Sequence, residues 1–141
     1  MRTRGRVTVM AALFSALSLT AFAQSAVAAS PAPQPADKTS PWQVSQGSAS
    51  ASGTHTNKPL VFFQRITVEG EFKNTGSGCS TLWFQWGDES GASFEKSASS
   101  CGPGTVPVKA QADVPVSGNS FVYICKGTED VKDCGSRVLI S

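Results

Sequence analysis

Polar and apolar residues alternate with a period of two through most of the chain after residue 41, and turn-forming residues interrupt the alternation about every ten residues. Successive side chains of a β-strand point to opposite faces of a sheet, so this alternation predicts strands with one buried face. No stretch shows a convincing helical period. We therefore expect an all-β protein.

The longest alternating stretch covers residues 60–73. One face is expected to point into the core and carries Leu60, Phe62, Ile66, Val68 and Phe72. The other face is polar and carries Arg65, Thr67, Glu69, Glu71 and Lys73. Val61, Phe63 and Gln64 do not fit the alternation, so a bulge or a break is expected near them.

Further strands are predicted over 42–44, 80–86, 92–98, 106–114, 120–125 and 137–140, with turns at Asn74–Gly78 and Gly87–Gly91. In the strand over 80–86, Leu82, Phe84 and Trp86 share one face. Pro107 lacks an amide hydrogen, which predicts an edge strand or a bulge there. Six or seven short strands in about 100 residues predict a two-layer antiparallel sandwich of immunoglobulin-like size. A small β-barrel is the alternative.

The N-terminal 29 residues have the pattern of a secretory signal peptide. A cationic start, Met1–Arg6, precedes the apolar run Val7–Ala23, and small residues follow with two competing A-x-A cleavage sites, Ala21–Ala23 and Ala26–Ala28. A transmembrane anchor is the alternative, although the run has only the minimum length for spanning a bilayer. Residues 30–41 are rich in proline and alanine and predict an extended tether. A single domain is then expected over 42–141.

The charge balance argues against a polyanionic partner. The chain has 12 Lys and Arg residues and 10 Asp and Glu residues, but three of the basic residues, Arg2, Arg4 and Arg6, lie in the expected signal peptide. Nine basic residues then face ten acidic ones, without a basic cluster. We expect no nucleic-acid partner and no membrane association after signal removal. The mature protein is expected to be a monomer outside the cell.

Four cysteines, Cys79, Cys101, Cys125 and Cys134, lie in the expected domain of an exported chain, which predicts two disulfides. Their spacing does not resemble a zinc site, and no metal or other cofactor is expected. Opposed residues of a hairpin have a constant sum of position numbers. Cys79 and Cys101 have the same sum as Trp86 and Phe94; Cys125 and Cys134 have the same sum as Phe121 and Val138. We therefore expect the pairs Cys79–Cys101 and Cys125–Cys134, with Phe121 and Val138 on one face.

The titratable residues do not form a recognisable catalytic motif. His55, the single histidine, lies in a polar stretch without a G-x-S-x-G motif, and is expected in a solvated loop. Glu69 and Glu71 share a face with basic residues, as in a solvated sheet. Glu129, Asp130 and Asp133 do not match a calcium loop. We expect a protein that is not an enzyme.

The aromatic residues Trp83, Phe63 and Tyr123 are the candidate binding residues, because exposed rings on a secreted sandwich form platforms for sugars or for a protein partner. The alternative is that these rings complete a thin core or cover a disulfide. Strict alternation places Trp83 on the face of Cys79, so either a bulge intervenes or Trp83 packs on the Cys79–Cys101 bridge. This parity favours a buried Trp83.

The chain resembles the small exported two-disulfide β-domain proteins of actinobacteria without an assigned activity, through Thr67–Asn74 and Cys125–Thr128. That resemblance implies no functional residue. The expected function is a secreted binding module for an extracellular or cell-wall polysaccharide. The alternatives are an envelope structural protein or a protein-binding module, such as a hydrolase inhibitor that uses Gly87–Gly91 or Lys126–Asp133.

Overall fold

The computed structural model describes residues 36–88 and 91–141. The expected signal peptide, residues 30–35 of the expected tether, and residues 89 and 90 of the expected Gly87–Gly91 turn lie outside the described residues. Within the described ranges the chain forms eight strands: β1 Lys38–Gln46, β2 Ala49–Pro59, β3 Phe63–Asn74, β4 Cys79–Trp86, β5 Ser93–Cys101, β6 Gly104–Pro115, β7 Phe121–Lys126 and β8 Val138–Leu139. These ranges contain no helix that is long and apolar enough to cross a membrane.

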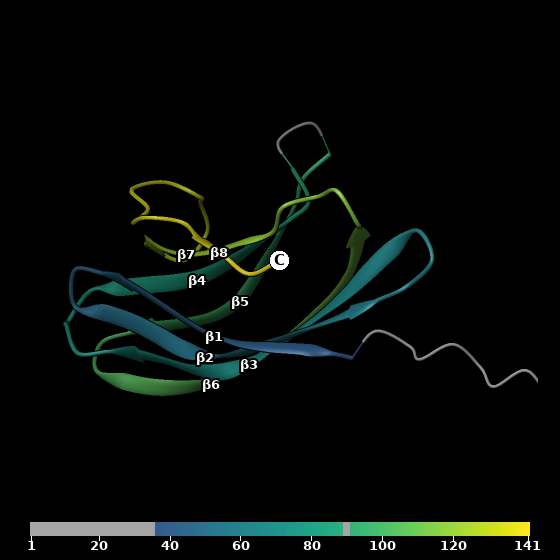
Figure 1. Cartoon of the computed structure of the whole chain (residues 1–141). Coiled ribbons are helices and arrows are strands. Elements are labelled where there is room, and N and C mark those ends of the chain that lie inside the picture. The colour runs from purple at the N-terminus through teal and green to yellow at the C-terminus, as the bar shows by residue number, and fades with distance from the viewer. Residues whose placement is uncertain (1–35, 89–90) are drawn as a thin grey trace, which may run out of the picture. The chain divides into compact units, whose positions relative to one another are not determined.

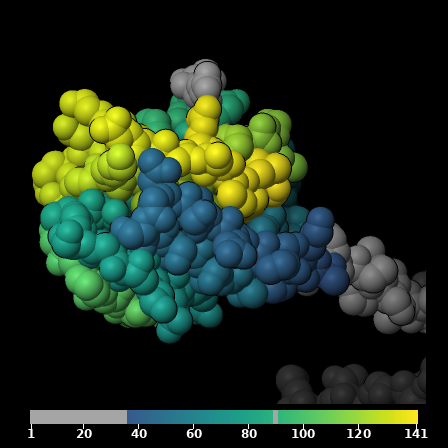
Figure 2. Space-filling model, turned by 90° about the vertical axis from the view of Figure 1, so that its left-hand side faces the viewer, coloured from purple at the N-terminus to yellow at the C-terminus, as the bar shows by residue number. Residues whose placement is uncertain are grey.

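The strands form two antiparallel layers, which confirms the two-layer sandwich over the barrel (Figure 1). Sheet A has the order β1-β2-β3-β6, and sheet B has the order β5-β4-β7-β8. The chain passes between the layers after β3, after β5 and after β6. In Figure 2 the C-terminal segment, coloured yellow, covers the sheet B side above the blue strands of sheet A.

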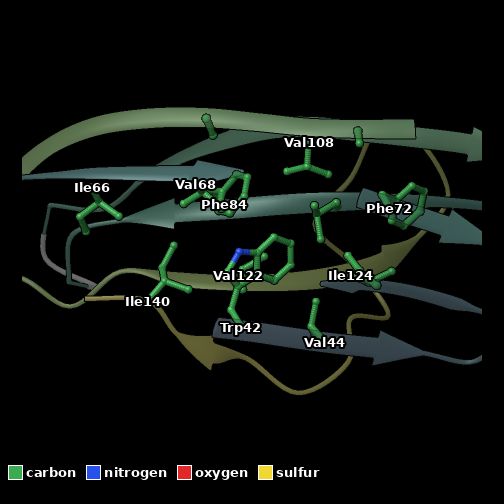
Figure 3. Packing of buried hydrophobic residues seen from close by; sticks show 14 of the residues in the cluster. Trp42, Val44, Ile66, Val68, Phe72, Phe84, Val108, Val122, Ile124 and Ile140 are labelled. Carbon is green, nitrogen blue, oxygen red and sulfur yellow. The ribbon is translucent and has the colours of Figure 1, made fainter. Parts of the chain in front are cut away.

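The core lies between the sheets, where buried side chains of both layers point toward one another (Figure 3). Phe84 stacks on Trp86 at a centroid distance of 5.1 Å and meets the ring of Trp42 edge-on at 6.4 Å. The faces predicted from alternation are confirmed for Ile66, Val68 and Phe72 of β3 and for Leu82, Phe84 and Trp86 of β4.

Strand β2 was not predicted, because its core-facing positions carry small residues. Ala49 and Ala51 are buried, and Gly53 lies opposite Trp42 on one side and Gly70 on the other. A Cβ atom on Gly53 would collide with the carbonyl oxygen of Glu69, so only glycine fits there. Strand β1 also begins earlier than expected, because residues 38–41 of the predicted tether pair with β2.

His55 belongs to β2, and the prediction of a solvated loop histidine is wrong. The side chain faces the interior and is only 8% exposed. Burial, and then the charge of Lys38, lower the pKa of His55. The neutral imidazole is therefore the form that suits this position.

The beginning of the 60–73 stretch also differs from the prediction. Leu60 and Phe62 were expected in the core, but they lie at the tip of the β2–β3 hairpin and are exposed. The amide of Leu60 donates a hydrogen bond to the carbonyl oxygen of Phe63 at 2.8 Å, which closes the turn. The expected break near Gln64 is thus a reversal of the chain, and β3 starts at Phe63.

Both predicted disulfides are present, Cys79–Cys101 and Cys125–Cys134. Away from the bridges the registers differ from the simple hairpin rule. The β4–β5 register shifts by one residue between Leu82 and Trp83, so Trp86 lies opposite Ser93 and not Phe94. Val138 lies opposite Val122 instead of Phe121, and therefore packs against the main core. Pro107 is on β6, an edge strand of sheet A, as expected.

Candidate functional site

Strand β4 is buried on both faces. Its outward-facing side chains Thr81, Trp83 and Gln85 are buried, like its core side chains. Trp83 lies opposite Tyr123 of β7, and these two rings pack with Cys125 in a second apolar cluster, separate from the main core. Phe121 and Cys134 contact the cluster from its margin. The outer face of sheet B is therefore a small core of its own.

The cover over this cluster is the bridged loop, residues 126–134, which the second disulfide closes. The hydroxyl of Thr81 donates to the carbonyl oxygen of Gly127 at 2.7 Å. The ammonium group of Lys96 donates to the carbonyl oxygen of Thr128 at 3.1 Å and lies 3.5 Å from the carboxylate of Glu129. These bonds fix the loop to β4 and β5, so its position does not depend on the disulfide alone.

A pocket of about 330 Å³ opens between the bridged loop and β5. Gln85 and Tyr123 come from the sheet, Ala92 and Phe94 form one side, and the other side consists of Val131, Cys134, Gly135 and Arg137. Most of these groups are apolar, with a few polar ones among them, which is the usual composition of a small-molecule site. Phe94 is 54% exposed and presents its ring at the pocket.

The polar groups of the pocket are held in place. A guanidinium nitrogen of Arg137 donates to Oε1 of Gln85 at 3.2 Å, and the guanidinium carbon lies 5.4 Å from the centre of the Phe121 ring. Burial raises the pKa of Tyr123, an effect that the charge of Arg137 opposes. The phenol is therefore neutral at physiological pH and can donate a hydrogen bond.

The predicted binding residues do not form one platform. Trp83 is only 9% exposed and Tyr123 only 2%, while Phe63 lies apart from them at the start of β3. The buried position favoured for Trp83 is confirmed. The bridge beside Trp83 is Cys125–Cys134, so the prediction that Trp83 packs on the Cys79–Cys101 bridge is wrong. The bridged loop folds back over β4, and no local pattern in the sequence indicates that contact.

Three of the residues that give the pocket its character, Gln85, Phe94 and Arg137, were not among the predicted binding residues. Phe94 was expected opposite Trp86, where it would face the core. The one-residue register shift places it opposite Gln85, on the outer face. One signal for this exchange was available, because the parity of Cys79 and Trp83 predicted either a bulge or a Trp83 packed on a disulfide. A bulge in the partner strand exchanges the faces of all residues beyond it.

The carboxylates considered for catalysis or calcium binding lie elsewhere. Glu69 is exposed on the outer face of sheet A, 3.6 Å from the ammonium group of Lys109, and the carboxylate of Asp130 lies 3.0 Å from Lys132. Within residues 36–88 and 91–141, no group of three or more His, Cys, Asp or Glu side chains is arranged to hold a metal ion.

Comparisons of the chain with protein-family models, with curated proteins and with solved structures found no match. Function is therefore inferred from the side chains around the pocket and from the fold that positions them.

Proposed function

We propose that the protein is a secreted binding module, and that the pocket on the outer face of sheet B holds one sugar residue of an extracellular or cell-wall polysaccharide. The observation that carries this proposal is the exposed ring of Phe94 beside three fixed polar groups, those of Gln85, Tyr123 and Arg137. A pyranose has an apolar C–H face and a rim of hydroxyl groups. An aromatic ring covers the first, and amide, phenol and guanidinium groups bind the second.

The size of the pocket supports a single ring as the bound unit. Its volume of about 330 Å³ is at the lower end of the range for small-molecule sites, about 300–1,000 Å³. Val131, which is also partly exposed, extends the apolar surface on the side opposite Phe94.

The chemistry of the polar groups supports binding without catalysis. A guanidinium is always protonated, the phenol of Tyr123 has a raised pKa, and an amide does not titrate. None of the three accepts a proton at neutral pH, as a general base must. Secretion is supported by the signal-peptide pattern and is compatible with the two disulfides.

Retention on chitin, cellulose and peptidoglycan tests the proposal. We expect Phe94→Ala to weaken binding to the preferred glycan at least about tenfold, equivalent to about 1.4 kcal/mol. Leu139→Ala is the matched control, because Leu139 is equally exposed on β8 but does not line the pocket. Retention that Phe94→Ala leaves unchanged would place the glycan elsewhere, and a lack of retention on all three glycans would refute the polysaccharide assignment.

A second assay addresses catalysis. The purified protein should release no product from these glycans or from generic hydrolase substrates. Turnover that disappears in His55→Ala would show that the protein is an enzyme. Inhibition of a secreted protease or amylase, without retention on a glycan, would instead favour a protein-binding module.

A further inference from the structure

The tip of the β2–β3 hairpin carries an apolar surface that the proposed pocket does not explain. Val61 is 85% exposed and Phe62 77%, and Leu60 and Phe63 on either side of them are also exposed. We call these four residues the apolar tip. Exposed Val116 lies nearby, because it follows Pro115, the partner of Phe63 across β3 and β6.

The folding of the hairpin does not require these side chains. Two-residue hairpin loops favour asparagine and glycine at the turn, because these residues tolerate positive φ angles. Here the turn between Leu60 and Phe63 contains valine and phenylalanine. Neither residue adds to the main core, whose members come from other positions. Neither Val61 nor Phe62 has a positive φ angle, so the turn tolerates these residues without requiring them. Adjacent exposed apolar side chains that add nothing to the core are typical of an interaction site.

The charges beside the apolar tip favour an anionic partner. Lys58 precedes the tip, and no acidic residue occurs between Lys58 and Val68. Lys38 is also near, since it opposes Asn57 at the start of β1. Asp113 binds the guanidinium of Arg65 at 2.7 Å, and Asp37 adjoins Lys38 in the chain and offsets its charge. These groups together therefore leave one positive charge beside the apolar tip, that of Lys58.

From this arrangement we propose that the apolar tip inserts into the interfacial region of a lipid bilayer that contains anionic headgroups. The apolar side chains enter the boundary between headgroups and acyl chains, while the ammonium group of Lys58 remains at the level of the phosphates. The inference is independent of the sugar site, because none of the residues of the apolar tip lines the pocket. Net charge alone predicted no membrane contact, but the driving force here is the burial of apolar side chains.

The size and shape of the apolar tip favour a bilayer over a protein partner. A stable protein–protein interface buries about 1,200–2,000 Å² of surface in total. Four side chains at a turn are too few to supply one partner's share of that area. These side chains are exposed at the tip of a hairpin, so a protein partner would need a cavity that matches them. A fluid bilayer adapts to any such shape. The start of β1 lies at the same end of the sandwich as the β2–β3 hairpin (Figure 1).

Co-sedimentation with lipid vesicles tests the inference. The protein is purified after secretion, and mass spectrometry identifies its N-terminus. This check is needed because the apolar run Val7–Ala23 would itself bind lipids if it were retained. Vesicles of phosphatidylglycerol and phosphatidylcholine are compared with vesicles of phosphatidylcholine alone. We expect binding to the mixed vesicles that weakens with salt.

The variant Val61→Ser/Phe62→Ser should lower partitioning at least about tenfold, as the loss of two large apolar side chains predicts. The control Leu139→Ser removes an exposed apolar side chain of β8 and should bind like the wild type. Phe62→Trp should show a blue-shifted emission on adding mixed vesicles. Absence of vesicle binding, or binding that the double variant leaves intact, would refute the inference. A dimer that the double variant abolishes, without vesicle binding, would assign the apolar tip to a second copy of the chain.

Discussion

The outer faces of the two sheets are built from the same kind of strand but have opposite environments. On sheet A, Arg65 forms two hydrogen bonds with Asp113, at 2.7 and 2.8 Å, and the side chains around this pair are polar and open to solvent. On sheet B, the positions at the centre of the outer face hold Trp83 and Tyr123, and both are buried. A sheet that is buried on both faces shows a nearly continuous run of bulky side chains instead of alternation.

This difference is visible in the sequence of individual strands. Strand β3 alternates strictly between apolar and polar positions from Ile66 to Glu69, whereas β4 carries Leu82, Trp83, Phe84 and Trp86 with little alternation. The bridged loop supplies the cover that β4 requires. The stability of sheet B should therefore depend on the Cys125–Cys134 disulfide more strongly than the stability of sheet A does.

The largest effect is expected from the disulfides. In the chain-entropy model each bridge stabilises the fold by roughly 3 kcal/mol, so reduction of both should cost about 6 kcal/mol. The whole domain is stable by only about 5–15 kcal/mol. Denaturant titration with and without a reductant should therefore show a protein that is largely unfolded when reduced.

Removing one disulfide at a time distinguishes the outer cluster of sheet B from the main core. Cys125→Ala/Cys134→Ala should loosen the bridged loop and make Trp83 accessible to acrylamide, while Trp42 and Trp86 in the main core stay protected. Cys79→Ala/Cys101→Ala should cost a similar free energy without exposing Trp83. Equal quenching in the two variants would show that the outer cluster does not depend on its own bridge.

The next largest effect should come from Trp83 itself. Trp83→Ala should lower the free energy of unfolding by about 3–5 kcal/mol, as truncation of a core aromatic side chain does. Thr54→Ala, at an exposed position on the outer face of sheet A, should stay within about 0.5 kcal/mol. Urea denaturation of the two variants makes the comparison. A nearly neutral Trp83→Ala would mean that the outer face of sheet B is solvated like that of sheet A.

Those parts of the fold that depend on local alternation were predictable from the sequence. The core positions of β3 and β4 and both disulfides follow from periodicity and hairpin symmetry, because these relations involve residues close in the chain. Strand β2 was missed because Ala49, Ala51 and Gly53 give no strong apolar signal. The pocket was missed because it depends on one bulge and on the return of the bridged loop over β4, both of which tertiary packing decides.

A smaller effect tests whether sheet A tolerates substitutions only on its outer face. At Gly53 an added methyl group would collide with the backbone of β3, so Gly53→Ala should cost about 1–3 kcal/mol, as overpacking does. Ser52→Ala is the matched control, because Ser52 is the preceding residue and is exposed on the opposite face. Thermal or urea denaturation of both variants should show a large difference between these neighbours. Equal stabilities would mean that β2 and β3 can separate without cost.

The smallest effect at neutral pH concerns His55, whose contribution becomes visible only in acid. The pKa of His55 is lowered in the folded protein by burial and by the charge of Lys38, while in the unfolded chain it is near the ordinary histidine value of 6.5. The unfolded state therefore binds the proton more readily, and the stability associated with neutral His55 is present above pH 6.5 and is lost as the pH falls toward the folded pKa. His55→Gln should remove this part of the pH dependence. Because His55 is the single histidine of the chain, the difference between wild type and variant in urea titrations at about pH 7.5 and 5 isolates its contribution from that of the carboxylates, which titrate lower. If both proteins lose the same stability over this range, His55 is solvated in the folded state, and water reaches the inner face of sheet A at this position.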